Sequence, residues 1–137
     1  MKHLLLILIS LLLLSSPVIG DNHKGETLYL WGKYPDFKWM GFGDKDTQPK
    51  YQGDVENGKP NGLGVINYPD GSRYEGGWEN GLFNGQGIFS KSNGTKYVGS
   101  WKIIDGVTSH WNGKYYDEDG IIKYQWVDGQ LIKQYKT

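Results

Sequence analysis

The sequence predicts an all-β fold assembled from consecutive β-hairpins. Three observations lead to this prediction: a fixed period, aromatic residues spaced by two, and recurring Asn-Gly or Asp-Gly pairs. The period is 23 residues, because Tyr51, Tyr74 and Tyr97 each open the same pattern. A period of roughly 20–50 residues is typical of proteins built from stacked repeats. Beyond the first 20 residues, no segment has sustained apolar residues at helical spacing, so no helix is predicted there.

The aromatic spacing predicts the first strand of each repeat. Tyr74, Gly76 and Trp78 are separated by two residues, which places them on one face of a strand. Aromatic side chains favour strands, and the central Gly leaves room for the flanking rings to lie across it. The pair Asn80-Gly81 then tolerates the positive φ angles of a two-residue hairpin turn.

The return strand is predicted at 87–90, and Asn93-Gly94 turns the chain into the next repeat. In Gly85-Gln86-Gly87 the glycines allow two backbones to approach closely. One hairpin alone is marginal in water, so we expect neighbouring hairpins to stabilise one another through a shared row of rings. Nine glycines recur as structural residues of the repeat: Gly53, Gly58, Gly62, Gly64, Gly76, Gly81, Gly85, Gly87 and Gly99.

The order Tyr-x-Gly-x-Trp, Asn-Gly, Gly-x-Gly and Asp-Gly resembles the MORN repeat. The resemblance covers Tyr51 to about Trp101, with one departure at Val55, where Trp is expected. It implies an elongated, curved, single-layer antiparallel sheet without enzymatic activity. It also implies a role in protein association or in attachment near membranes, often beside a catalytic domain that this chain lacks.

Residues 1–20 are predicted to be a secretory signal peptide with a helical apolar centre. Lys2 and His3 make a short positive start, Leu4–Leu14 is an apolar run interrupted only by Ser10, and Val18-Ile19-Gly20 offers small residues for cleavage. The alternative is an uncleaved membrane anchor. However, the run is shorter than the roughly 20 residues that a spanning helix needs.

Residues 21–50 are predicted to be an N-terminal cap with a degenerate repeat, because terminal repeats must cover an exposed sheet edge. We expect strands at 27–31 and 37–40. Gly41-Phe42-Gly43 stands ten residues before Tyr51, as a repeat triplet would.

The repeats proper are assigned to 51–101, and the period breaks after Trp101. Residues 102–110 lack the Gly spacing, so 102–137 is predicted to hold an irregular link followed by a C-terminal variant repeat that caps the sheet. The variant repeat is expected at 113–131, where Tyr-Tyr and Asp-Gly pairs return.

Charge and composition exclude some function classes. Without Lys2, 14 basic residues face 15 acidic ones, so there is no basic surplus for nucleic acid. The absence of Cys excludes disulfides and a lipid-attached lipoprotein, and it favours a bacterial periplasm or exterior over an animal secretory pathway. The chain is therefore expected to be secreted through Sec and to be periplasmic or extracellular.

The sequence holds no constellation for catalysis. His110 is interpreted as a surface or packing residue, since no Cys is available for a soft metal site. Asp44-Lys45-Asp46 and Asp117-Glu118-Asp119 are interpreted as turns, because neither completes a calcium loop. We therefore predict that the chain is not an enzyme and has no metal and no cofactor.

Two function classes remain open. The first is a non-catalytic interaction scaffold of the bacterial cell envelope that binds a protein partner through its sheet face. The second is a module whose aromatic groove takes an envelope glycan or lipid headgroups. The candidate binding residues form the aromatic ladder: Tyr51, Tyr74, Trp78, Tyr97 and Trp101. The alternative for these rings is that they pack against one another and build the fold.

Overall fold

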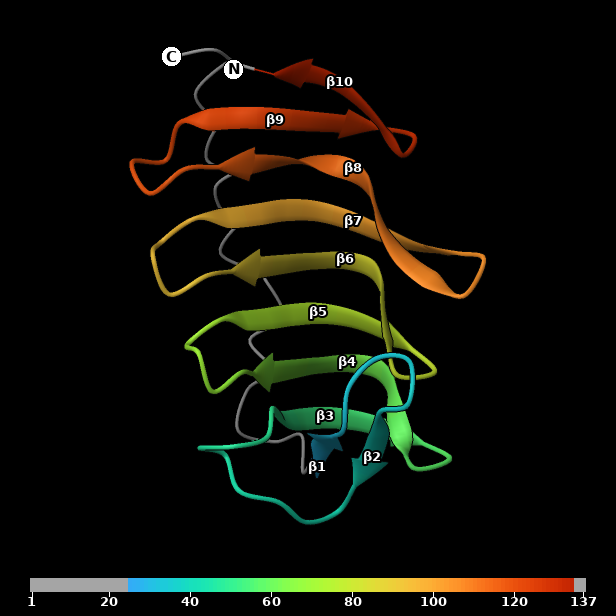
Figure 1. Cartoon of the computed structure of the whole chain (residues 1–137). Coiled ribbons are helices and arrows are strands. Elements are labelled where there is room, and N and C mark those ends of the chain that lie inside the picture. The colour runs from blue at the N-terminus through green and yellow to red at the C-terminus, as the bar shows by residue number, and fades with distance from the viewer. Residues whose placement is uncertain (1–24, 135–137) are drawn as a thin grey trace, which may run out of the picture.

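The computed structural model of the chain describes residues 25–134, and these residues form one open antiparallel sheet of ten strands (Figure 1). The strands are β1 (Glu26–Trp31), β2 (Lys38–Met40), β3 (Lys50–Glu56), β4 (Lys59–Asn67), β5 (Arg73–Glu79), β6 (Leu82–Ser90), β7 (Lys96–Ile104), β8 (Val107–Tyr116), β9 (Ile122–Val127) and β10 (Gln130–Gln134). The all-β prediction is confirmed, and the described part of the chain has no helix. The predicted signal peptide and its helix lie outside the described residues.

Four hairpins stack in chain order, β3–β4, β5–β6, β7–β8 and β9–β10 (Figure 1). Each closes through a two-residue turn in which both residues have positive φ, the geometry that matches the twist of the flanking strands. These turns are Asn57-Gly58, Asn80-Gly81, Asp105-Gly106 and Asp128-Gly129. The return strands are longer than predicted, because β6 starts directly after its turn, at Leu82.

The prediction of an irregular link at 102–110 is wrong. β7 continues to Ile104 and β8 begins at Val107, with Ile103 opposite Thr108. The period appeared broken because this hairpin is longer, so its Asp105-Gly106 turn comes later in the repeat. The expected C-terminal variant repeat does form strands, as β9 and the strands on either side of it.

The N-terminal segment differs from a degenerate repeat in strand order. Strands occur near the predicted positions, but β2 lies at the edge of the sheet and β1 stands between β2 and β3. Leu28 of β1 is opposite Tyr51, the place that Ile66 of β4 takes opposite Tyr74. Gly43 lies against the ring of Tyr29, but the Gly41–Gly43 triplet is outside the strands, whereas the repeat triplets lie inside the return strands β4 and β6.

Each repeat Tyr lies across a Gly of the following return strand. A Cβ built on Gly64, Gly87 or Gly113 would come within 2.2–2.5 Å of the ring or hydroxyl of Tyr51, Tyr74 or Tyr97, respectively. The prediction placed the rings across the Gly of their own strand instead. At Gly76 a Cβ would chiefly meet backbone, with Gln86 O at 2.3 Å and Gly87 Cα at 2.5 Å. Gly76 is therefore needed for the approach of two strands.

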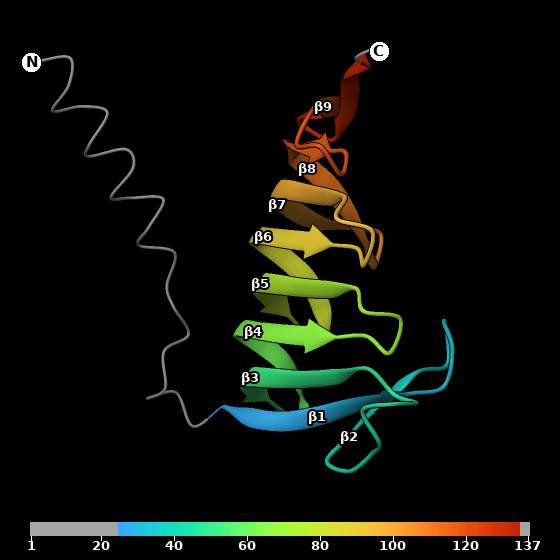
Figure 2. The same cartoon turned by 90° about the vertical axis from the view of Figure 1, so that its left-hand side faces the viewer.

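A β-bulge follows Gly53 on β3, Gly76 on β5 and Gly99 on β7. A bulge leaves one residue out of the ladder. In every repeat the Tyr hydroxyl donates to the carbonyl of that extra residue: Tyr51 to Asp54 at 2.6 Å, Tyr74 to Gly77 at 2.8 Å and Tyr97 to Ser100 at 2.9 Å. Bulges bend strands, and the sheet bends into an open trough (Figure 2).

Candidate binding groove

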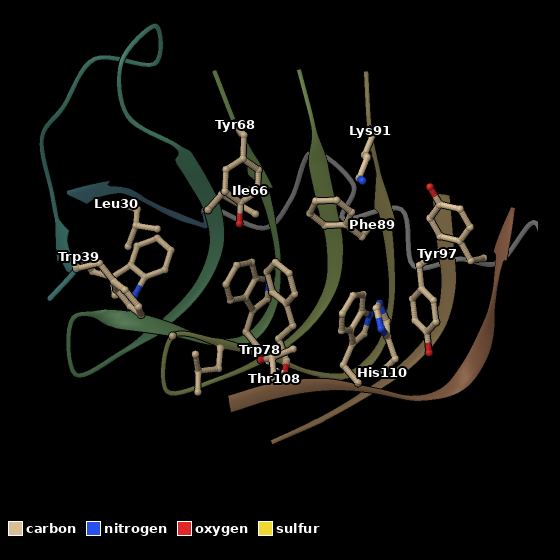
Figure 3. A pocket seen from close by; sticks show the side chains of 16 residues that line it. Leu30, Trp39, Ile66, Tyr68, Trp78, Phe89, Lys91, Tyr97, Thr108 and His110 are labelled. Carbon is tan, nitrogen blue, oxygen red and sulfur yellow. Dashed lines mark hydrogen bonds between the residues drawn. The ribbon is translucent and has the colours of Figure 1, made fainter. Parts of the chain in front are cut away.

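The concave side of the sheet forms an apolar groove with a volume of about 510 Å³ (Figure 3). Its lining comes from β1, β2 and the strands from β4 to β8, with Leu82 and Phe83 following a hairpin turn. Ligand sites in proteins are concave, mostly apolar and lined by aromatic side chains with a few polar groups. The groove has this composition.

The structure divides the predicted aromatic ladder into two sets. Three members line the groove: Trp78, Tyr97 and Trp101, which are 5%, 2% and 8% exposed. The other two, Tyr51 and Tyr74, are fully buried and do not line it. The rings meet mostly edge to face, as between Tyr74 and Trp78 at 5.3 Å. Packing is thus their main observed role, and ligand binding by the groove-facing three stays a prediction.

More open parts of the groove come from residues that the repeat pattern does not mark. Phe83, Phe89 and Tyr68 are half-buried and line the groove, and Phe83 stacks on Tyr74 with ring centroids 3.7 Å apart. The positions of Phe83 and Phe89 one period earlier hold Pro60 and Ile66. Because these positions vary between copies, the repeat alone could not find them. Because successive side chains of a strand point to opposite faces, the even spacing between Phe83 and Phe89 in β6 could have predicted that both lie on one face.

Trp39 of β2 compensates for Val55, the departure from the repeat pattern. In the second repeat, Trp78 lies edge-on to the Tyr of its own copy, Tyr74, at 5.3 Å. In the first repeat, Trp39 comes from the N-terminal segment to lie edge-on to Tyr51 at 6.0 Å and to Trp78 at 6.0 Å. The first repeat therefore keeps an indole beside its Tyr, although its own strand carries Val.

His110 lies among aromatic rings at the β8 end of the groove (Figure 3). Its ring centroid is 4.1 Å from that of Tyr97, 4.5 Å from Trp101 and 4.7 Å from Trp126. It stands opposite Trp101, as Phe83 stands opposite Trp78 in the second repeat. Burial lowers the pKa of His110 below its ordinary value of 6.5. His110 is thus a packing residue, one of the two roles that the sequence suggested.

The groove has little charge. Among residues 25–134, Lys91 is the one charged side chain that lines it, and no carboxylate of these residues does. Burial, with the nearby charge of Asp70, raises the pKa of Tyr68 to about 12, so its hydroxyl stays protonated. The indole N–H groups of Trp39 and Trp101 are buried without a hydrogen-bond partner in the described structure. The few polar groups are therefore mostly donors.

The acidic pairs singled out in the sequence serve turns. Asp44 accepts from the backbone N–H of Asp46 at 2.9 Å, and Asp117 accepts from those of Asp119 and Ile121 at 3.0 and 2.9 Å. Within residues 25–134, no three His, Cys, Asp or Glu side chains are grouped so that they could hold a metal ion. The same residues include no helix long and apolar enough to cross a membrane.

Comparison with known families agrees with this geometry. The family model described as MORN repeat matches residues 51–73 and 74–96. Both matches begin at the repeat Tyr and contain one hairpin each, β3–β4 and β5–β6. No curated protein matches the chain. With two matched copies, the 23-residue period and the stacked hairpins, the chain is a MORN repeat protein.

Proposed function

We propose that this protein is a non-catalytic interaction scaffold of the bacterial cell envelope and that it binds a protein partner through the concave groove. The observation that carries the proposal is the open apolar groove lined by half-buried rings. Aromatic side chains clustered in a desolvated pocket are the usual anchors of protein interfaces. MORN repeats are commonly modules that bind proteins or membranes. The envelope location is supported by the apolar run at 4–14 and by the absence of Cys.

The second candidate function is the binding of a glycan or a lipid headgroup, and the observation that favours it is the partly exposed rings of the groove. A glycan presents many hydroxyl groups, each of which loses a hydrogen bond to water when it is buried. The groove offers only a few polar side chains, among them Tyr68, Lys91 and His110. An apolar protein surface matches this lining better than a sugar does, because it leaves fewer buried polar groups unpaired.

Neighbouring residues of β6 supply a matched test. Phe89 lines the groove, whereas Ile88 is 41% exposed and points to the opposite face, because successive side chains of a strand alternate. Purified wild type, Phe89→Ser and Ile88→Ser would each be used to capture proteins from envelope extract. Removal of an interface anchor costs about 2 kcal/mol, or roughly 30-fold in affinity. We expect Phe89→Ser to lose the proteins that wild type and Ile88→Ser retain.

Folding must be confirmed for each variant by circular dichroism before binding is compared. Equal capture by folded Phe89→Ser and wild type would contradict the proposal. If Ile88→Ser lost the captured proteins and Phe89→Ser retained them, the binding site would lie on the convex face instead.

A further inference from the structure

We propose, on the basis of the proposed function, that the partner presents an apolar peptide segment that lies across the strands and places a carboxylate against Lys91. The occupant is thus an acidic amphipathic segment of another protein. The proposal rests on the charge of the groove, its direction relative to the strands, and its length.

The charge argument starts from Lys91. Its side chain extends from the rim of the groove (Figure 3), and among the described residues its ammonium has no carboxylate partner. Within residues 25–134 the lining holds no Asp or Glu, although the charge of Asp70 lies near Tyr68, so a carboxylate that enters beside Lys91 meets a cation. Charge complementarity of this kind selects partners and orients them.

The preceding repeat places a second donor on the same rim. Tyr68 stands one period before Lys91, and its hydroxyl has no hydrogen-bond partner in the described structure. Burial keeps this hydroxyl protonated, so it donates to an acceptor. The rim therefore offers a hydroxyl and an ammonium in a row, above a floor of rings. An apolar segment with an acidic side chain fits both parts of the groove, because its apolar groups contact the rings and its carboxylate accepts from the donors at the rim.

The direction of the groove determines how the segment is recognised. Its lining runs from β1 to β8, across the strands rather than along an edge. A segment in it cannot join the sheet as an added strand, because the backbone groups of the inner strands are already paired. Recognition must therefore occur through side chains, with apolar groups on the rings and the carboxylate at the rim.

The length of the groove favours a peptide over a single lipid chain. Six strand intervals separate β1 from β8 in the sheet, which makes about 29 Å at roughly 4.8 Å each. Two opposed acyl chains span the roughly 30 Å of a bilayer core, so one chain covers about 15 Å. A single long-chain carboxylate shares the required chemistry, but it fills only about half of the groove. A peptide can cover its whole length.

The test uses a displayed library of random 16-residue peptides, selected separately on the purified wild-type chain and on Lys91→Glu. We expect wild type to enrich apolar peptides that contain Asp or Glu, and Lys91→Glu to enrich Lys or Arg at the same place. A synthetic peptide from the wild-type pool should bind Lys91→Glu at least about tenfold more weakly than it binds wild type. A version of this peptide with Asn or Gln in place of its Asp or Glu should bind wild type at least about tenfold more weakly than the original peptide does. Lys96→Glu is the matched control, because Lys96 lies over the ring of Tyr116 and does not line the groove.

The outcomes separate this inference from the proposed function. Selected peptides that bind Phe89→Ser as well as wild type do not use the groove, which would contradict the proposed function. Peptides that need Phe89 but lack acids and ignore Lys91→Glu would overturn only the charge assignment. If no peptide is selected, the peptide assignment is wrong. Quenching of Trp fluorescence by dodecanoate would then identify the groove as a lipid site.

Discussion

Tyr51, Tyr74 and Tyr97 each have two functions in the sheet. The ring covers a Gly of the next strand, and the hydroxyl satisfies the carbonyl that a β-bulge leaves outside the ladder. The sequence predicted a packed Tyr and a nearby Gly, because both recur with the period. It could not show which Gly lies under which ring, because that depends on the register between strands.

The contact between Tyr74 and Gly87 gives the sharpest test at this scale. A Cβ on Gly87 would lie 2.5 Å from the Tyr74 ring, so Gly87→Ala must displace a buried ring. We expect a loss of about 1–3 kcal/mol in the free energy of unfolding, measured by urea denaturation. Gly41→Ala is the control, because nothing lies within 4 Å of a Cβ there. Equal stability of the two variants would show that the ring does not cover Gly87.

The burial of His110 predicts a pH dependence of stability. Because burial lowers its pKa in the folded state, the unfolded chain binds the proton more readily below pH 6.5. The stabilising contribution of the neutral ring is present above pH 6.5 and is lost as the pH falls through the lowered folded pKa. Urea midpoints of wild type should therefore decrease from pH 7 to pH 5 more steeply than those of His110→Gln. Parallel decreases in the two proteins would contradict this assignment.

At the scale of the element, hairpin turns were predictable and strand order was not. Asn-Gly and Asp-Gly pairs mark the turns, because few other residues accept positive φ at both positions. The Asp105-Gly106 turn was missed because the longer β7–β8 hairpin shifts it within the repeat. The place of β2 outside β1 depends on non-local packing, and Trp39 supplies that packing through Tyr51 and Trp78.

Trp39 and Val55 should behave as one unit. If Trp39 fills the place of the missing repeat Trp, Val55→Trp overpacks the first repeat and costs about 1–3 kcal/mol. Trp39→Ala alone should cost roughly 3 kcal/mol. In the double variant the new indole takes the space that Trp39 leaves. The loss in unfolding free energy should therefore be smaller than the sum of the two single losses by at least about 0.5 kcal/mol. Thermal or urea unfolding of the four proteins measures this difference, and simple additivity would show that the two sites are independent.

For the whole molecule, the single sheet layer explains why a groove exists. Seven buried hydrophobic side chains form one core cluster, and no second layer covers the concave face within residues 25–134. The repeat pattern predicted the Tyr and Trp members of this cluster, and the resemblance predicted the curvature. The half-buried rings at the surface of the groove, such as Phe83 and Phe89, were not predicted, because repeat copies differ there.

Crosslinking in living cells tests the central claim, that the concave face carries the partner. A photoreactive phenylalanine would replace either Phe89 or Ile88, adjacent residues on opposite faces of β6. Irradiation should give a defined crosslinked protein from position 89 and none from position 88. Acidic segments should be found at the crosslinked site if the Lys91 assignment is also correct. A crosslink from position 88 with none from position 89 would contradict the account.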